Sequence, residues 1–366
     1  MTHFDLDPIQ QWWPSDALPR LIAGPCSVET REQMIATAER VAATKTTAYL
    51  RGGIWKPRTR PDSFEGVGEK GIAWMLEARE KTGLPIITEV ANAQHVELCL
   101  KAGFDALWIG ARTTVNPFTV QEIATALKGV DIPIVVKNPV NPDLQLWIGA
   151  LERIHRAGIK KLVALHRGFS FHGTSIYRNK PMWEIPISLQ AQFPEIPLFC
   201  DPSHISGRRD LLFAVGQKGL DLGMSGLMIE SHITPDEAWS DAKQQITPER
   251  LGELIKELVV RHSNADSVQI ENQLALFREQ IDKVDEEIIH LLGQRIAINK
   301  QIGLYKKEHH ITILQLERWK EILQTRTEWA EQAGLTPAFI KAYLDALHAE
   351  SIRTQTRVMN DGHSTT

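Results

Sequence analysis

The sequence has few cysteines and lacks long apolar runs, a basic leader and a strong net charge. Its 366 residues include three cysteines, too few for a disulfide framework and typical of a reducing compartment. No apolar stretch approaches the roughly 18 residues of a membrane span. The first residues, MTHFDLDPIQQWW, lack the regions of a secretory signal. A net charge of −4 does not suggest nucleic-acid or membrane binding, so we expect a cytoplasmic protein without either partner.

Alternating apolar and amphipathic segments fill residues 20–262. With 43% hydrophobic and 23% charged residues, the chain has an ordinary globular composition, and its length predicts roughly two domains. The apolar runs cover residues 21–23, 48–50, 86–87, 106–109, 134–136, 162–165, 198–200 and 227–229, and the helix-like segments include 31–43, 70–82, 120–128, 149–157 and 208–218. This rhythm predicts a closed (β/α)8 TIM barrel. A doubly wound open sheet would concentrate its ligand residues near one switch point instead.

A residue able to bind a metal or an anion follows each apolar run. These residues are Cys26, Arg51, Glu89, Arg112, Lys137, Arg167, His204 and Glu230. Because the C-terminal ends of barrel strands share one mouth, the pattern predicts an enzyme with its active site there.

Cations dominate the predicted mouth. They are Arg51, Lys56, Arg58, Arg60, Arg112, Lys137 and Arg167. Any one of them could form a salt bridge, but several around one mouth repel each other unless a polyanion binds. Arginine binds both carboxylate and phosphate in bidentate fashion, so the cations favour small ligands that carry these groups.

A second set of residues could bind a metal: Cys26, His204, Glu230 and Asp241. Taken alone, a cysteine such as Cys26 is more often a small buried hydrophobe. Together, thiolate, imidazole and carboxylate suit a divalent ion such as Mn, Fe, Co or Zn better than Mg or Ca.

Seven motifs at the predicted strand ends carry a family resemblance. They are GPCSVE (24–29), RGGIWKPRT (51–59), GART (110–113), VKNP (136–139), HRG (166–168), DPSH (201–204) and IESH (229–232). Over residues 20–262 the chain resembles 3-deoxy-D-arabino-heptulosonate 7-phosphate (DAHP) synthase, most closely the type I beta group. The resemblance implies a metal-dependent, aldol-like condensation of phosphoenolpyruvate with erythrose 4-phosphate. The alternative is the sister octulosonate 8-phosphate synthase, which resembles Lys-Ala-Asn-Arg-Ser where this chain has Lys-Pro-Arg-Thr (56–59).

The resemblance assigns roles residue by residue. Cys26, His204, Glu230 and Asp241 would bind the metal. Arg51, Lys56, Arg112, Lys137 and Arg167 would hold phosphoenolpyruvate, with Arg112 and Arg167 on its phosphate side and Lys56 also catalytic. Arg58 and Thr59 would bind the phosphate of erythrose 4-phosphate. A non-enzymatic phosphosugar binder is hard to reconcile with four metal-type ligands.

The pattern changes after the barrel domain, which we place at residues 1–262 with its last helix over 247–262. Residues 263–269 (SNADSVQ) are mostly small and polar, and we place a linker at residues 263–271. From residue 272 to 307, apolar residues follow a heptad spacing: Leu274, Phe277, Ile281, Val284, Ile288, Leu291, Ile298, Ile302 and Tyr305. This spacing predicts a helix of roughly 50 Å. With helices near 314–333 and 336–357, it predicts an all-α domain over 272–360 that dimerises, followed by a disordered tail over 361–366.

Arg295 occupies an apolar slot of this heptad pattern. Burying it costs several kcal/mol unless an anion binds it, although a register-setting or surface-reaching arginine is the structural alternative. Lys306 lies within about 20° of the same helix face. Arg278 lies about 25 Å away and about 100° around the helix, so it could reach the same ligand only from an antiparallel partner chain.

Over residues 272–357 the chain resembles the all-helical chorismate mutases. The matching residues are Arg278 (from the partner), Arg295, Lys306, Gln315, Arg318, Ser351 and Gln355. The resemblance implies that Arg278 and Arg295 clamp the two carboxylates of chorismate. Lys306 and Gln355 would then stabilise the ether oxygen during rearrangement to prephenate. Two residues depart from the family, because Gln315 stands where aspartate is frequent and Trp319 where better-known members have glutamate.

The two resemblances together imply a bifunctional enzyme of the shikimate pathway and aromatic amino-acid biosynthesis. Chorismate or prephenate bound to the helices could inhibit the barrel, provided that the ligand favours one of two arrangements. The alternative is that the helices are a non-catalytic module for dimerisation or sensing.

Overall fold

The computed structural model describes residues 3–58, 62–261 and 268–360. The chain divides into two compact units, Met1–Ser263 and Asn264–Thr366. Among the described residues, no helix is both long enough and apolar enough to cross a membrane.

The first unit is built on eight parallel strands. They are β1 (Arg20–Gly24), β2 (Tyr49–Arg51), β3 (Ile86–Val90), β4 (Ala106–Ile109), β5 (Ile134–Lys137), β6 (Leu162–His166), β7 (Leu198–Cys200) and β8 (Gly226–Glu230). Each strand pairs with the next, and β1 pairs with β8 in parallel, which closes the sheet. The predicted (β/α)8 barrel is therefore confirmed.

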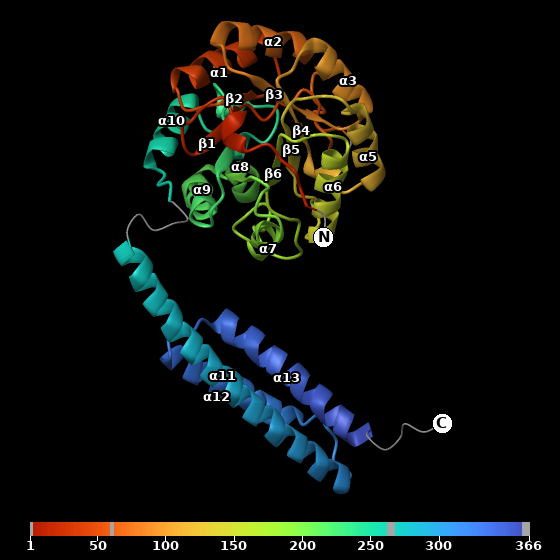
Figure 1. Ribbon diagram of the computed structural model, residues 1–366, viewed down its shortest axis with the longest axis vertical. Helices are drawn as coiled ribbons and strands as arrows, with labels where there is room; N and C mark the ends of the chain where they lie inside the picture. The colour runs from red at the N-terminus through yellow and green to blue at the C-terminus, as the bar shows by residue number, and fades with distance from the viewer. Residues whose placement is uncertain (1–2, 59–61, 262–267, 361–366) are drawn as a thin grey trace. The chain divides into compact units, whose positions relative to one another are not determined.

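Helices surround these strands in a ring (Figure 1). The ring contains α1 (Arg31–Ala43), α2 (Lys70–Thr82), α3 (Ala93–Ala102), α5 (Pro117–Ala126), α6 (Leu144–Arg156), α7 (Glu184–Gln192), α9 (Leu212–Asp221) and α10 (Pro248–Glu257). Two short helices, α4 (Ala111–Thr114) and α8 (Pro202–Ser206), follow β4 and β7. Several helices begin at a side chain that accepts a hydrogen bond from a free backbone N–H of the first turn, as Thr30 does for α1 and Asp143 for α6.

The core of the barrel unit has an inner and an outer layer. Trp108, Phe199 and Met228 are buried inside the barrel, and Trp13 from the N-terminal segment packs edge-on against Phe199. The outer layer lies between strands and helices, where Trp147 of α6 is fully buried and donates to the carbonyl of Val136 at 3.3 Å. The inner layer fills the barrel below its mouth, which leaves the strand ends as the place where a ligand can bind.

Two details of the barrel differ from the sequence prediction. The short helices α4 and α8, which the periodicity does not reveal, follow β4 and β7 directly and carry Arg112 and His204. The last helix, α10, ends at Glu257 rather than at residue 262. It ends there because the backbone N–H and carbonyl of Val259 are both taken by the side chain of Gln217, at 2.9 Å each.

The second unit contains three helices, α11 (Val268–Glu308), α12 (Leu316–Gln332) and α13 (Pro337–Asn360). α13 packs along α11 and also contacts α12. The predicted linker over 263–271 is wrong at its end, because α11 begins at Val268 and residues 268–271 are helical. The helix can include these residues because adding residues to an already formed helix needs no new nucleation. The rest of that linker and the predicted tail lie outside the described residues.

The first half of α11 has no cover within its own unit. Every residue from 273 to 291 is exposed, including the apolar heptad residues Phe277, Ile281 and Val284. The second half packs against α13 and contributes buried polar side chains, among them Asn299 and Lys306. One face of α11 thus leaves a continuous apolar surface exposed.

Candidate active sites

Three of the four predicted metal ligands meet at the barrel mouth. Cys26, Glu230 and Asp241 each place a ligand atom within 4.8 Å of the other two. The thiol of Cys26 lies 3.2 Å from Oδ2 of Asp241, and burial raises the pKa of that thiol. His204 stands beside this group, with its Nε2 3.6 Å from Oε1 of Glu230. Cys26, Glu230 and Asp241 thus offer one sulfur and carboxylate oxygens to a common space, and His204 adds a ring nitrogen beside Glu230.

A buried carboxylate organises the neighbouring side chains. Oδ2 of Asp201 lies 2.9 Å from Nζ of Lys137 and 2.7 Å from Nδ1 of His204. Burial alone would raise the pKa of Asp201, but His204 and Lys137 beside it hold that pKa well below its usual range. The ionised carboxylate therefore neutralises Lys137 and fixes the orientation of the His204 ring.

A second buried ion pair joins Arg51 to Glu230. The Nη2 of Arg51 lies 3.1 Å from Oε1 of Glu230, and both side chains are 0% exposed. The Nε and Nη1 atoms of Arg51 have no hydrogen-bond partner among the described residues. The guanidinium also lies 4.9 Å from the ring centre of Trp108, which supports it from below.

The remaining cations surround a pocket at the mouth. Lys56, Arg58, Arg112, Lys137, Arg167 and Arg178 line it together with Glu89, His204 and Asp241. Burial lowers the pKa of Arg167 to about 10. An anion in this pocket would offset the unfavourable burial of these positive charges.

The proposed aldose loop is only partly described. Arg58 lines the mouth pocket and donates from Nε to the carbonyl of Phe64 at 2.8 Å. Thr59 and Arg60 lie outside the described residues.

Three residues at the mouth were not assigned a role from the sequence: Asp201, Arg178 and Gln244. Asp201 stands first in the DPSH motif, so its motif could have revealed it. Arg178 bonds to Asp241 at 2.8 Å and to Gln244 at 2.7 Å, and Gln244 donates to Glu230 at 2.6 Å. Arg178 and Gln244 follow no strand directly, so only the folded loops reveal them.

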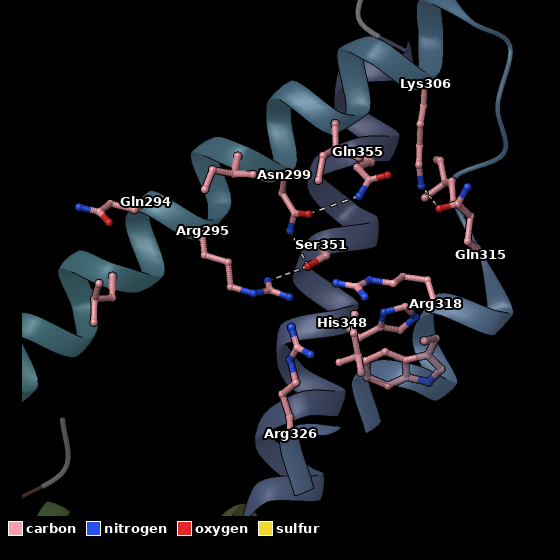
Figure 2. Close-up of a pocket in the computed structure, with 16 residues that line it drawn as sticks. Gln294, Arg295, Asn299, Lys306, Gln315, Arg318, Arg326, His348, Ser351 and Gln355 are labelled. Atoms are coloured by element: carbon pink, nitrogen blue, oxygen red, sulfur yellow. Dashed lines mark hydrogen bonds between the residues drawn. The ribbon is translucent and has the colours of Figure 1, made fainter. Parts of the chain in front are cut away.

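Six of the seven residues assigned to the helical site line one cavity of about 520 Å³. They are Arg295, Lys306, Gln315, Arg318, Ser351 and Gln355. Figure 2 shows these side chains converging from α11, from α13, from the first turn of α12, which carries Arg318, and from Gln315 just before it. Arg278, the seventh, is exposed on the uncovered half of α11 and lies outside this cavity.

Hydrogen bonds position the floor of this cavity. The hydroxyl of Ser351 accepts from Nη1 of Arg295 at 2.9 Å and from Nδ2 of Asn299 at 2.5 Å. Lys306 donates to the carbonyl of Ile313 at 2.6 Å, and burial lowers its pKa. The Oε1 atom of Gln355 is buried without a partner among the described residues. These contacts direct donors from α11 and α13 into one cavity.

Four further polar residues line the cavity and were not assigned from the sequence: Gln294, Asn299, Arg326 and His348. Asn299 follows Arg295 by one helical turn, so that spacing could have indicated it. Arg326 and His348 come from α12 and α13, and only the packing of the three helices brings them to Arg295. The ring of His348 stacks on Trp319, with ring centres 3.8 Å apart.

Comparisons with known proteins match the two parts of the chain to two enzyme families. Residues 14–264 match the model of the DAHP synthetase I family, and residues 277–356 match that of chorismate mutase type II. The phospho-2-dehydro-3-deoxyheptonate aldolase of Thermotoga maritima is 32% identical over 238 residues, which cover 65% of this chain and 68% of the relative. A crystal structure of DAHP synthase from T. maritima superposes with a TM-score of 0.59 at 31% identity, covering 65% of this chain and 67% of that chain.

Relatives with the sister octulosonate activity also match this chain. The 2-dehydro-3-deoxyphosphooctonate aldolase of Rhodopseudomonas palustris is 25% identical over 246 residues, which cover 62% of this chain and 82% of the relative. Its lower identity gives the octulosonate alternative less support than the heptulosonate prediction.

The barrel, its mixed ligand group and its cationic mouth define an enzyme that acts at the strand ends. The chain belongs to the DAHP synthetase I family, and its helices form a chorismate mutase type II domain. The two resemblances predicted from the sequence are thereby confirmed. Members of the synthase family are generally metal-dependent enzymes.

The network around Asp201 predicts a large stability effect. Asp201→Asn keeps the shape of the side chain but leaves Lys137 buried without its counter-charge. We expect the free energy of unfolding of the barrel to fall by about 3–5 kcal/mol in urea denaturation. Asp210→Asn is the matched control, because Asp210 forms an exposed ion pair with Arg208. Equal, small effects of both substitutions would contradict this role of Asp201.

Proposed function

We propose that the barrel condenses phosphoenolpyruvate with erythrose 4-phosphate to form DAHP and phosphate. The observation that carries this proposal is the mouth pocket, where six cationic side chains stand beside the cluster of Cys26, Glu230 and Asp241. Two anionic substrates repel each other in water, and fixed cations can hold both in contact. The Lys-Pro-Arg-Thr sequence over 56–59 and the T. maritima relative both favour the four-carbon aldose.

Cys26, His204, Glu230 and Asp241 would hold a divalent metal of the Mn, Fe, Co or Zn class. The residues fit such an ion, because the atoms of three of them already lie within 4.8 Å of one another and combine soft and hard donors. When bound, the ion supplies a Lewis acid for the aldehyde oxygen of the aldose. Arg178 and Gln244 would orient two of the carboxylate ligands through the contacts described above.

Phosphoenolpyruvate would be held by Arg51, Lys56, Arg112, Lys137 and Arg167. Lys137 and Arg51 are each anchored by a buried carboxylate, so their positions are set before the substrate binds. Arg112 and Arg167 would take the phosphate group. Lys56 lines the mouth pocket, and its Nζ donates to the carbonyl of Cys26 at 3.2 Å, beside the metal ligands. Arg58 and Thr59 would bind the phosphate of the aldose.

The helical cavity would convert chorismate to prephenate. Arg295 would bind a carboxylate, Arg318 and Ser351 would position the substrate, and Gln315 would hydrogen-bond its hydroxyl group. Lys306 and Gln355 would stabilise the negative charge that develops on the ether oxygen. This site is built from neutral polar groups and cations, which suits a dianionic substrate whose rearrangement needs no proton transfer.

A homodimer would complete this site. The uncovered half of α11 carries apolar residues that are 42–61% exposed at Leu274, Phe277, Ile281, Val284, Ile288 and Leu291. Such a stripe pairs readily with a second helix. An antiparallel partner would bring Arg278 toward the cavity, where it would bind the second carboxylate.

Prephenate or chorismate bound to the helices would also inhibit the barrel. Prephenate, the mutase product, derives from DAHP, the synthase product. The concentration of prephenate therefore depends on the rates of both reactions. Inhibition requires that the ligand bind one arrangement of the molecule more tightly than another. The alternative, in which the helices only dimerise or sense a ligand, differs from our proposal in predicting no turnover of chorismate.

Metal removal separates the two activities. Exhaustive dialysis against EDTA should abolish DAHP formation, Mn²⁺ should restore it, and conversion of chorismate in the same sample should not change. Cys26→Ser should reduce the metal retained per chain in elemental analysis. Cys99→Ser, which alters a buried cysteine in α3, should not. Full DAHP formation in metal-free protein would overturn the metal site.

Lys306→Ala tests the mutase site. Loss of the ammonium group should lower kcat/KM for chorismate by at least about a hundredfold, because an electrostatic donor to the transition state is removed. DAHP formation should not change. Lys300→Ala, on the exposed side of α11, is the matched control. A wild-type protein that forms DAHP but does not convert chorismate would instead support the non-catalytic module.

Removal of residues 264–366 tests both regulation and assembly. The shortened chain should form DAHP without inhibition by prephenate, whereas the full chain should be inhibited. In sedimentation analysis it should also lose the association that the helices provide. Inhibition that survives the truncation would place the effector site on the barrel and contradict our proposal.

A further inference from the structure

The helical cavity carries more positive charge than its own protein groups neutralise. Its lining contains four cations, Arg295, Lys306, Arg318 and Arg326, and neither aspartate nor glutamate. Arg318 forms an ion pair with Glu321 at 2.6 Å. Arg295, Lys306 and Arg326 form no ion pair with the described residues, although the pKa of the exposed Glu321 is lowered by Arg318 and, at longer range, by Arg326. Arg295 and Lys306 therefore have no counter-charge among the described residues, and Arg326 has only a share of the exposed Glu321 that already pairs with Arg318.

Arg326 lies on the face of α12 that lines the cavity. Arg318, Ile322 and Arg326 follow one another at intervals of four residues, and all three belong to the cavity lining. Figure 2 shows the side chain of Arg326 reaching toward the region of Arg295 and Ser351, at the end of the cavity away from Lys306 and Gln315. Arg326 and Arg295 also share the wall of a neighbouring, more apolar cavity. The two guanidinium groups thus face the same space.

Neutral groups hold Arg326 in this position. Its Nη1 donates to the hydroxyl of Thr325 at 2.7 Å, and its guanidinium lies 4.5 Å from the ring centre of Trp329. Both contacts orient the side chain, but neither cancels its charge. A half-buried arginine that is oriented without being neutralised retains donors for an anionic ligand.

We propose that Arg326 binds a carboxylate of the ligand in this cavity, beside Arg295, and makes the cavity selective for dicarboxylates. The proposal rests on the proposed mutase function for the identity of that ligand. Arg326 comes from the same chain as Arg295, Lys306 and Gln355, so it contributes a second guanidinium independently of the Arg278 expected from a partner. Arg295 and Arg326 then bind carboxylate at one end of the cavity. Lys306 and Gln355 contact the ether oxygen of the ligand at the other end.

The experiment measures ligand binding to the full chain. Prephenate, with two carboxylates, and phenylpyruvate, with one, are titrated by calorimetry into wild type and Arg326→Gln. Because a charge-assisted hydrogen bond is lost, the affinity for prephenate should fall about ten- to a hundredfold. The affinity for phenylpyruvate should fall less, so the preference for the dicarboxylate should shrink. Arg326→Lys should bind prephenate with intermediate affinity.

Two controls separate binding from structure. Arg353→Gln removes an exposed arginine of α13 that pairs with Glu350 outside the cavity, and it should bind prephenate within about twofold of wild type. Circular dichroism on each variant reports whether the helices are folded. If Arg326→Gln unfolds the helices, the Arg326→Lys variant tests the role of Arg326 in binding. Lysine keeps the positive charge at this position but lacks the guanidinium group that binds a carboxylate. The affinity of this variant for prephenate should then still fall, with less change for phenylpyruvate.

The outcomes also distinguish this inference from the proposed function. A folded Arg326→Gln variant that binds prephenate as wild type does would overturn the role of Arg326 alone. An equal loss of affinity for both ligands would overturn the claimed selectivity. A wild-type chain that neither binds prephenate nor converts chorismate would overturn the mutase function, and the assignment of Arg326 with it.

Discussion

Closure of the barrel is the constraint on which the synthase site depends. The parallel pairing of β1 with β8 places Gly24 opposite Glu230, two residues that are far apart in the sequence. Gly24 makes the close approach of β1 to β2 possible. Its φ is 144°, and a Cβ atom there would stand 2.2 Å from the carbonyl oxygen of Arg51. This packing lets Cys26, Arg51 and Glu230 share one small volume.

The two sites handle positive charge in different ways. At the barrel mouth, buried carboxylates neutralise part of the charge, as Glu230 does for Arg51 and Asp201 for Lys137. These ion pairs fix the cations before any ligand binds. In the helical cavity, neutral oxygens orient Arg295 and Lys306 without neutralising them, so a ligand must supply the negative charge. The barrel can therefore hold its geometry alone, whereas the cavity gains more from its ligand.

The sequence was sufficient to predict the barrel and the meeting of its strand-end residues. Period and spacing carry that information, because each strand ends at the same rim. They also placed Arg295 and Lys306 on one face of a helix. Arg178 and Arg326 could not be predicted in this way. Arg178 lies in a loop and Arg326 on a different helix from Arg295, so their positions depend on tertiary packing rather than on local pattern. The roles assigned to the site residues stay predictions.

The small core of the helical unit has a consequence for its lifetime. Ala330, Ile340 and Leu344 form a buried cluster there, supported by partly buried neighbours such as Trp319 and Ile322. A unit with so few buried apolar side chains has little stability in reserve. Any molecule that binds only its folded form shifts the equilibrium toward that form. The resistance of these helices to proteases would then rise with the concentration of their ligand. The amount of intact mutase domain would thus depend on the supply of that ligand.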